Sequence, residues 1–175
     1  MDLVAVGAGP GSFTGLRIGI ATAKALGAGL ALELRAVSTL AALAHAAADT
    51  TAPGQTCLAL IDGRRGEVFA ALEGPGPGPA WGPLVCGPET LIERCEQLSP
   101  RPLAVGSGAL RFRGELSASG IEVPPADHPV HRVAARDLCV IAAAGGGAAE
   151  IAPLYLRKPD AERWRERADL KRAGG

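Results

Sequence analysis

The segment from residue 3 to residue 30 constrains the fold most. Residues 3–6 form a short apolar run that is typical of a buried strand. A loop at residues 7–15 follows, with four glycines and one proline. The spacing of the next apolar and small residues then predicts a helix at residues 16–30, with one packed face made of Leu16, Ile20, Ala23 and Gly27. The chain therefore opens as strand, glycine-rich turn and helix.

The rest of the chain alternates between strand and helix patterns, which indicates an α/β protein. Strands are predicted at residues 32–37, 57–61, 67–72, 84–86, 103–105 and 121–123. Helices are predicted at residues 39–48, 88–98, 109–116 and 131–144. Residues 62–66 (Asp-Gly-Arg-Arg-Gly) predict a β-hairpin between two of the strands, because Asp-Gly and Gly supply the positive φ angles of such turns. A short extended segment is expected at residues 153–156, before a densely charged stretch at 157–172.

Composition excludes several classes of protein. Lys and Arg together number 18, as do Asp and Glu, so the chain has no global charge that would hold nucleic acid or an anionic membrane. No run approaches the ~18 apolar residues of a membrane span, and the first residues lack the pattern of a secretory signal. The four cysteines show neither C-x-x-C spacing nor disulfide-scaffold density, so we expect reduced thiols in a cytoplasmic protein. Only six residues are aromatic while 34 are alanine, so the core is expected to be small and closely packed.

The glycine-rich loop is a candidate anion-binding turn. Backbone N–H groups at a helix start can bind phosphate, and Ser12 or Thr14 can cap the helix. No Gly-Lys-Ser/Thr closes the loop, and Ser12 stands where a dinucleotide fingerprint needs its third glycine. A tight structural turn is thus the favoured interpretation, and anion binding remains open for Gly9, Gly11, Ser12 and Thr14.

Metal and nucleophile patterns are weak. His128 and His131 flank a proline, which favours exposed loop histidines over metal ligands, and we predict no metal site. Ser12 does not sit in a G-x-S-x-G elbow. Cys57 and Cys139 are interpreted as small buried residues. Arg64 and Arg65 fit a solvated hairpin turn better than a phosphate or partner contact, so no catalytic group emerges.

Several motifs resemble those of one known family. Residues 4–26 (VAVGAGPGSFTGLRIGIATAKAL) closely resemble the signature of the TsaB (YeaZ) family, whose members are non-catalytic partners in bacterial tRNA threonylcarbamoyladenosine synthesis. Later stretches resemble further landmarks of that family in the same order; they are residues 37–40, 61–69, 105–109 and 153–159. The resemblance implies an actin-like (ASKHA) two-lobed α/β fold.

The resemblance also implies a truncated first lobe. Family members begin with a strand hairpin and a helix before the strand that corresponds to residues 3–6, so we expect an in-frame extension upstream of Met1. We predict a remnant of the first lobe at residues 1–50, a second lobe at 56–160 and a charged tail at 161–175. Residues 49–55 are the expected linker.

The function implied by the resemblance is that of a scaffold for a TsaD-type threonylcarbamoyltransferase, with a TsaE-type ATPase docking to the pair. ATP and a metal are then expected in the partner subunits and no cofactor in this chain, with tRNA contacted indirectly and a homodimer formed when the chain is alone. The implied partner interface lies along the first helix, at Phe13, Leu16, Arg17, Ile20, Ala23, Lys24 and Gly27. The alternative is a nucleotide-binding actin-like ATPase or a peptidase-like hydrolase that uses the glycine-rich loop.

Overall fold

A computed structural model describes residues 2–74 and 79–157 of the 175-residue chain. The chain opens with β1 (Leu3–Gly9), α1 (Phe13–Leu30) and β2 (Glu33–Ser38). β1 and β2 pair in parallel as a two-stranded sheet, which the intervening helix makes possible. α2 (Thr39–Ala46) follows directly and is capped by Ser38, whose side chain accepts a hydrogen bond from the Ala41 N–H. The opening strand, turn and helix are confirmed.

A second sheet of four strands holds most of the core. Its order is β5 (Pro79–Cys86), β4 (Glu67–Glu73), β3 (Cys57–Arg64) and β6 (Leu103–Val105). β4 is antiparallel to both β3 and β5, and β6 runs parallel to β3. The predicted hairpin is therefore confirmed, and the strand predicted at residues 84–86 is the end of a longer one.

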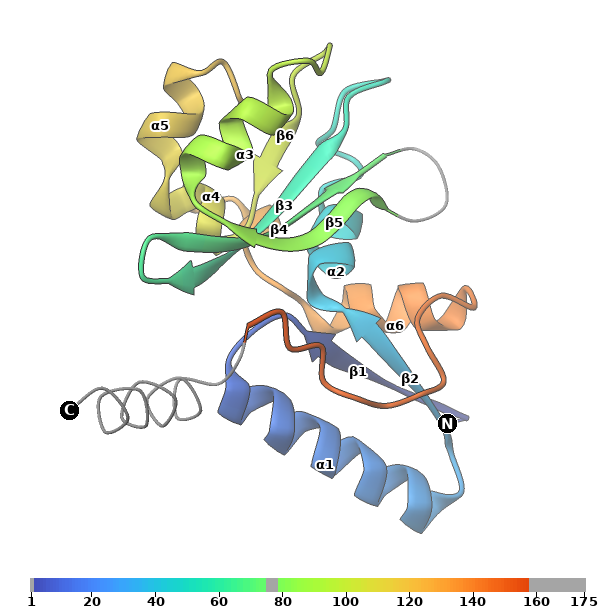
Figure 1. Cartoon of the computed structure of the whole chain (residues 1–175). Coiled ribbons are helices and arrows are strands. Elements are labelled where there is room, and N and C mark those ends of the chain that lie inside the picture. Colours follow the sequence, from blue (N-terminus) through green and yellow to red (C-terminus); the bar gives the residue numbers. More distant parts are fainter. Residues whose placement is uncertain (1, 75–78, 158–175) are drawn as a thin grey trace, which may run out of the picture.

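Helices cover both faces of the four-stranded sheet (Figure 1). α3 (Pro88–Cys95), α4 (Ser107–Arg111) and α5 (Arg113–Ala118) contribute Leu91, Ala109 and Leu116 to the core on one face. α2 covers the other face, where Leu40 and Leu43 pack on β3, β4 and β6. Because strand side chains alternate between faces, β3 and β4 each contribute side chains to the cores on both faces of the sheet.

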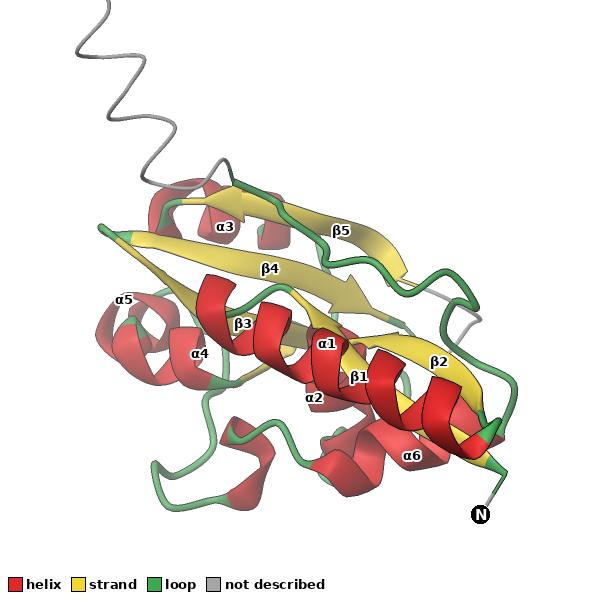
Figure 2. Cartoon of the chain, turned by 90° about the horizontal axis from the view of Figure 1, so that it is seen from below, coloured by secondary structure: helices red, strands yellow, loops and turns green. Residues whose placement is uncertain are grey.

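The two-stranded sheet lies between α1 and a later helix, α6 (Ala135–Ala143), as Figures 1 and 2 show. The inward residues of α1 are the four of the predicted face, Leu16, Ile20, Ala23 and Gly27. Beyond α6, Ala148 forms an isolated antiparallel bridge with Ala36 of β2. Residues after 134 thus return to the sheet that the first residues build, and the predicted division near residue 50 stays a prediction.

The hairpin turn lies one step later than its sequence predicted. Arg64 pairs with Glu67, and the two turn residues, Arg65 and Gly66, have φ angles of 57° and 81°. Arg64 itself has a φ of 65°. Gly63 instead occupies an irregular position in β3, where an added Cβ would stand 3.1 Å from the Glu67 carbonyl oxygen. The positive φ angles therefore fall on two arginines and one glycine, not on Asp62 and Gly63.

Three other predicted elements differ from the structure. Residues 121–123 form a single bridge between Glu122 and Leu103 instead of a strand. The helix predicted at 109–116 is divided at Phe112 into α4 and α5. The helix predicted at 131–144 starts at Ala135, because Pro129 opens a short 3₁₀ turn, η1 (Pro129–His131), before it.

The charged tail predicted at residues 161–175 lies outside the described residues. Among the helices of residues 2–74 and 79–157, none has the length and apolar character that crossing a membrane requires.

Candidate functional site

The glycine-rich turn joins β1 to α1 in a conformation that requires glycine at its start. Gly9 has a φ of 108°, a value that L side chains rarely adopt. A Cβ at this position would stand 3.1 Å from the Leu154 carbonyl oxygen and 3.0 Å from Leu16 Cδ1. The backbone of residue 154 also donates a hydrogen bond to the Ala8 carbonyl, with an N···O distance of 2.7 Å. The turn is thus in direct contact with the segment around Leu154, near the end of the described chain.

Ser12 caps α1. Its Oγ accepts a hydrogen bond from the Gly15 N–H at 3.4 Å, which satisfies one of the free donors of the first turn. On the other side of the turn, the Thr39 hydroxyl donates to the Pro10 carbonyl at 2.5 Å. Gly9 is buried, whereas Gly11, Ser12 and Thr14 are exposed. The turn has a structural role, and anion binding by these residues stays a prediction.

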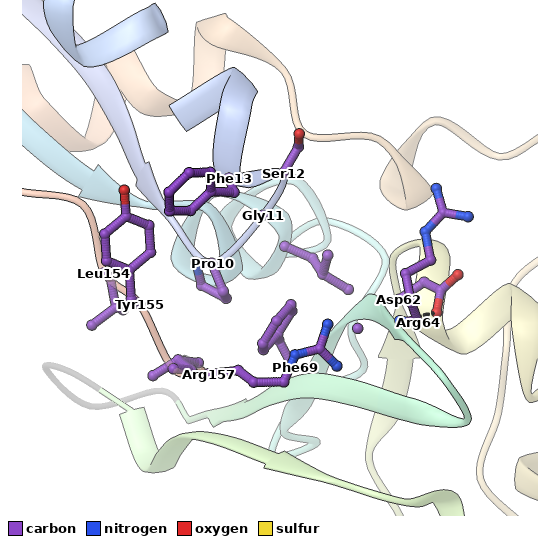
Figure 3. Close-up of a pocket in the computed structure, with 13 residues that line it drawn as sticks. Pro10, Gly11, Ser12, Phe13, Asp62, Arg64, Phe69, Leu154, Tyr155 and Arg157 are labelled. Carbon is purple, nitrogen blue, oxygen red and sulfur yellow. Dashed lines mark hydrogen bonds between the residues drawn. The ribbon is translucent and has the colours of Figure 1, made fainter. Parts of the chain in front are cut away.

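A cluster of two aromatic rings and one arginine closes the turn. The rings of Phe13 and Tyr155 stack with their centroids 5.2 Å apart and their planes at 28°. The Arg17 guanidinium carbon lies 4.0 Å from the centre of the Phe13 ring, and Arg17 Nε donates to the Tyr155 hydroxyl at 3.1 Å. Figure 3 shows Phe13 and Tyr155 side by side. Sequence reasoning missed Tyr155, although it is the only tyrosine and lies in the predicted extended segment.

A cavity of about 380 Å³ lies between this cluster and the tip of the β3–β4 hairpin. Its walls come from the turn (Pro10 to Phe13), the hairpin (residues 61–64 and Phe69) and residues 154–157. In Figure 3, Asp62 and Arg64 lie on the side of the cavity opposite Tyr155. The site therefore gathers three segments that are far apart in the sequence.

The two acidic side chains near the hairpin tip, Asp62 and Glu67, already have protein partners. The Asp62 carboxylate accepts hydrogen bonds from the Arg64 N–H at 2.8 Å and from Arg111 Nη1 at 3.2 Å. The backbone N–H of Asp62 donates to Ser107 Oγ at 3.1 Å. Arg157 Nη1 pairs with Glu67 Oε2 at 2.9 Å. These contacts stabilise the hairpin tip and leave Asp62 poorly placed to receive a ligand.

The structure changes the predicted partner interface on α1. Leu16, Ile20, Ala23 and Gly27 are buried against the sheet of this chain, so they cannot contact a partner while α1 stays packed. A Cβ on Gly27 would lie 2.7 Å from Leu34 Cδ2, so this glycine serves the approach of α1 to β2. The predicted residues that remain exposed are Phe13, Arg17 and Lys24. Sequence reasoning missed the exposed apolar residues Ile18, Leu26 and Leu30.

The three histidines are engaged within the protein. His131, expected to be exposed, is buried; its Nδ1 accepts from the Gly106 N–H at 3.1 Å and its Nε2 donates to the Pro124 carbonyl at 3.0 Å. His128 Nδ1 accepts from the Val130 N–H at 3.4 Å. His45 Nδ1 lies 3.0 Å from Asp137 Oδ1. Within the part of the chain that the structure describes, no three His, Cys, Asp or Glu side chains gather to hold a metal.

The cysteines are poor nucleophiles where they are buried. Burial raises the pKa of the Cys57 thiol to about 12, with a contribution from the Glu73 charge, and raises that of Cys95 to about 11. Burial also raises the pKa of Cys86. Cys57 is buried as predicted, whereas Cys139 is exposed, so the prediction for Cys139 was wrong.

The comparisons with known proteins found a matching family model, similar proteins and similar solved structures. The sequence profile described as "TsaD: tRNA N6-adenosine threonylcarbamoyltransferase" matches residues 1–125. The chain is 39% identical over 112 residues to the tRNA threonylcarbamoyladenosine biosynthesis protein TsaB of Escherichia coli, covering 62% of this chain and 48% of that protein. It is 32% identical over 168 residues to an uncharacterized protein of Mycobacterium tuberculosis (strain H37Rv), covering 93% and 67% of the two chains. The chain thus spans about half the length of the E. coli relative.

The solved structures that resemble this one carry the name YeaZ. YeaZ from Pseudomonas aeruginosa superposes with a TM-score of 0.63 at 26% identity, over 89% of this chain and 74% of that one. A second structure, described as an uncharacterized protein with similarity to peptidase YeaZ from Pseudomonas aeruginosa, gives 0.64 at 28% identity over the same shares.

Fold, turn and comparisons together define a class, namely α/β proteins of the actin-like fold. The predicted fold class is therefore confirmed. Within that class, the chain belongs to the TsaB (YeaZ) family.

Proposed function

We propose that this chain is a non-catalytic subunit in the biosynthesis of threonylcarbamoyladenosine in tRNA, next to the anticodon. It binds a TsaD-type threonylcarbamoyltransferase through the exposed face of α1, and a TsaE-type ATPase docks to that pair. ATP and metal act in the partner subunits, and tRNA is contacted mainly by them. Family membership and the name of the E. coli relative support the pathway.

The outer surface of α1 is the observation that carries the partner role. Ile18, Leu26 and Leu30 are 63%, 47% and 59% exposed, and they follow one another along the helix at steps of four or eight residues. α1 contains 18 residues, and its only charged side chains are those of Arg17 and Lys24. When a helix is buried on one face and its opposite face is also apolar, that second face is normally covered by another part of the protein or by a partner.

Charge also favours a particular kind of partner surface. Both charged residues of the exposed face are basic and α1 has no acidic residue. We therefore expect the covering surface to be apolar at its centre and acidic at its edge. Without that partner, the same face would pair two copies of the chain more weakly, because Arg17 and Lys24 would then face like charges.

The engaged polar groups support a non-catalytic role over the peptidase-like alternative. Hydrolysis by a serine or cysteine needs a nucleophile hydrogen-bonded to a base. In the described ranges, each histidine bonds to a carboxylate or to the backbone and none to a serine or cysteine. The nucleotide-binding alternative predicts that ATP binds this chain alone, which calorimetric titration tests directly.

The partner role is tested by co-purification with the TsaD-type protein of the same organism. Ile18→Glu and Leu26→Glu each place a charge at the centre of the exposed face, and we expect at least a tenfold loss of complex. Val140→Glu is the matched control, because Val140 is a comparably exposed apolar residue on α6. Unchanged binding by both α1 variants, or equal loss in the control, would contradict the proposed interface.

A further inference from the structure

A second cavity, of about 700 Å³, lies away from the glycine-rich turn. It is bounded by α2, by the ends of β3 and β4 that lie farthest from the hairpin tip, and by residues near α6. Most of its wall is apolar and made of small side chains, among them Ala44, Ala48, Ala71 and Ile141. Its volume and its mostly apolar lining are within the range of sites that bind small organic molecules, although one side is open to solvent.

One residue of the cavity wall, Glu73, departs from the apolar pattern of the inward side of β4. Along β4, Phe69, Ala71 and Glu73 share one side because strand side chains alternate, and Ala71 packs in the core beneath α2. An apolar residue is expected at the next inward position, yet the sequence places Glu73 there. The register puts Glu73 opposite Cys57, another residue of the cavity wall.

The Glu73 carboxylate has no partner within residues 2–74 and 79–157. It is half-buried, it takes part in no hydrogen bond or ion pair there, and burial raises its pKa. Residues 75–78, Pro-Gly-Pro-Gly, contain no charged side chain that could neutralise it. A half-buried carboxylate without a counter-ion is costly, and a cation is the group that would remove the cost.

His45 adds a second polar side chain to the same wall. Its Nδ1 lies 3.0 Å from Oδ1 of the buried Asp137, and since a carboxylate only accepts, Nδ1 carries the hydrogen. In the neutral imidazole, Nε2 is then the acceptor, and within the described chain it has no hydrogen-bond partner. The cavity therefore combines the Glu73 carboxylate and the His45 ring with an apolar interior.

We propose that this cavity binds a small organic cation, an ammonium group attached to an apolar body, with the ammonium paired to Glu73. The ammonium donates to the carboxylate, and the apolar body lies against the alanines of α2 and against Ile141. An anionic ligand would meet the Glu73 charge, and the cavity wall has no Lys or Arg side chain that would offset it. A bare metal ion would lack ligands, because Cys57 keeps its proton and the described residues bring no third ligand together.

The test uses three probes of one size, phenethylammonium, phenethyl alcohol and phenylacetate, titrated into the full chain and followed by amide NMR shifts. We expect phenethylammonium to bind at least tenfold more tightly than the alcohol and phenylacetate not to bind, with shifts centred on residues 44–48, 57 and 73. Glu73→Gln should weaken phenethylammonium at least tenfold and leave the alcohol unchanged. Glu93→Gln, an exposed carboxylate on α3, is the control and should change neither.

A second variant tests the cavity apart from the charge. Ala48→Leu reduces the free volume without touching Glu73, so phenethylammonium and phenethyl alcohol should both lose affinity while the spectrum stays that of a folded chain. The proposal is wrong if the ammonium and the alcohol bind equally, if Glu73→Gln binds the ammonium as the native chain does, if the shifts lie elsewhere, or if no probe binds. Because none of these measurements involves the TsaD-type partner, their outcome is independent of the proposed function.

Discussion

The four cysteines have separate environments that their sequence contexts do not distinguish. Cys57 and Cys95 are buried with strongly raised pKa values, Cys86 is partly buried, and Cys139 is exposed on α6. Only a thiolate attacks a disulfide reagent, so access favours Cys139, while burial and a raised pKa disfavour Cys57 and Cys95.

We predict one fast thiol in the native protein. Ellman's reagent at neutral pH should modify Cys139 within the mixing phase, whereas Cys57 and Cys95 should react only as the chain unfolds. Peptide mass mapping identifies the modified residue, and Cys139→Ser should remove the fast phase. Rapid labelling of Cys57 in the folded chain would contradict the burial described for it.

Single residues were predicted less well than the patterns that contain them. His131 was expected to be exposed because Pro129 marks a loop, and it is in a loop, but the loop folds over Gly106 and buries the ring. Cys139 was expected to be a small buried residue, and α6 presents it to solvent. In both cases the sequence indicated the local conformation, but burial depends on which other segments pack against that conformation, as Gly106 does against His131.

At the scale of the element, α1 was predicted best. Its four-residue face follows from the 3.6-residue period, and the structure buries those four residues. The period says which residues share a face but not which chain covers it, and here the cover is β1 and β2 of the same molecule. That is why Gly27, predicted to face a partner, instead contacts Leu34.

Gly27 and Gly29 of α1 allow the effect of close packing on stability to be measured apart from the effect of helix propensity. Gly27→Ala places a methyl group 2.7 Å from Leu34 Cδ2, so Leu34 must shift. We expect a loss of about 1 kcal/mol in the free energy of unfolding, because an overpacking cost of roughly 1–3 kcal/mol exceeds a propensity gain of about 1 kcal/mol. Gly29→Ala meets open space and should gain about 0.5 kcal/mol. Urea unfolding measures both, and a stabilised Gly27→Ala would show that α1 packs more loosely than described.

At the scale of the whole molecule, residues 151–157 join the two sheets. Leu154 bonds to Ala8 of β1 and Tyr155 contacts the start of α1, while Arg157 pairs with Glu67 of the hairpin. The sequence predicted an extended segment here and the two groups of strands, but not that this segment connects them. Such contacts span ninety positions or more, and no local pattern encodes them.

The stacked pair Phe13 and Tyr155 tests that connection, because the two rings meet only if the late segment lies on α1. In a double-mutant cycle with Phe13→Leu and Tyr155→Leu, we expect a coupling energy of about 0.5–1.5 kcal/mol in the free energy of unfolding. Arg17 contacts both rings, because its guanidinium lies over Phe13 and its Nε donates to the Tyr155 hydroxyl. The coupling energy therefore includes part of the Arg17 contribution, and Tyr155→Phe measures the share of the hydroxyl separately. Phe13→Leu combined with Phe112→Leu, two rings for which no mutual contact is described, should be additive. If Phe13 and Tyr155 were equally additive, the late segment would not rest on α1 in solution, and the 380 Å³ cavity, which needs residues 154–157 as a wall, would open to solvent.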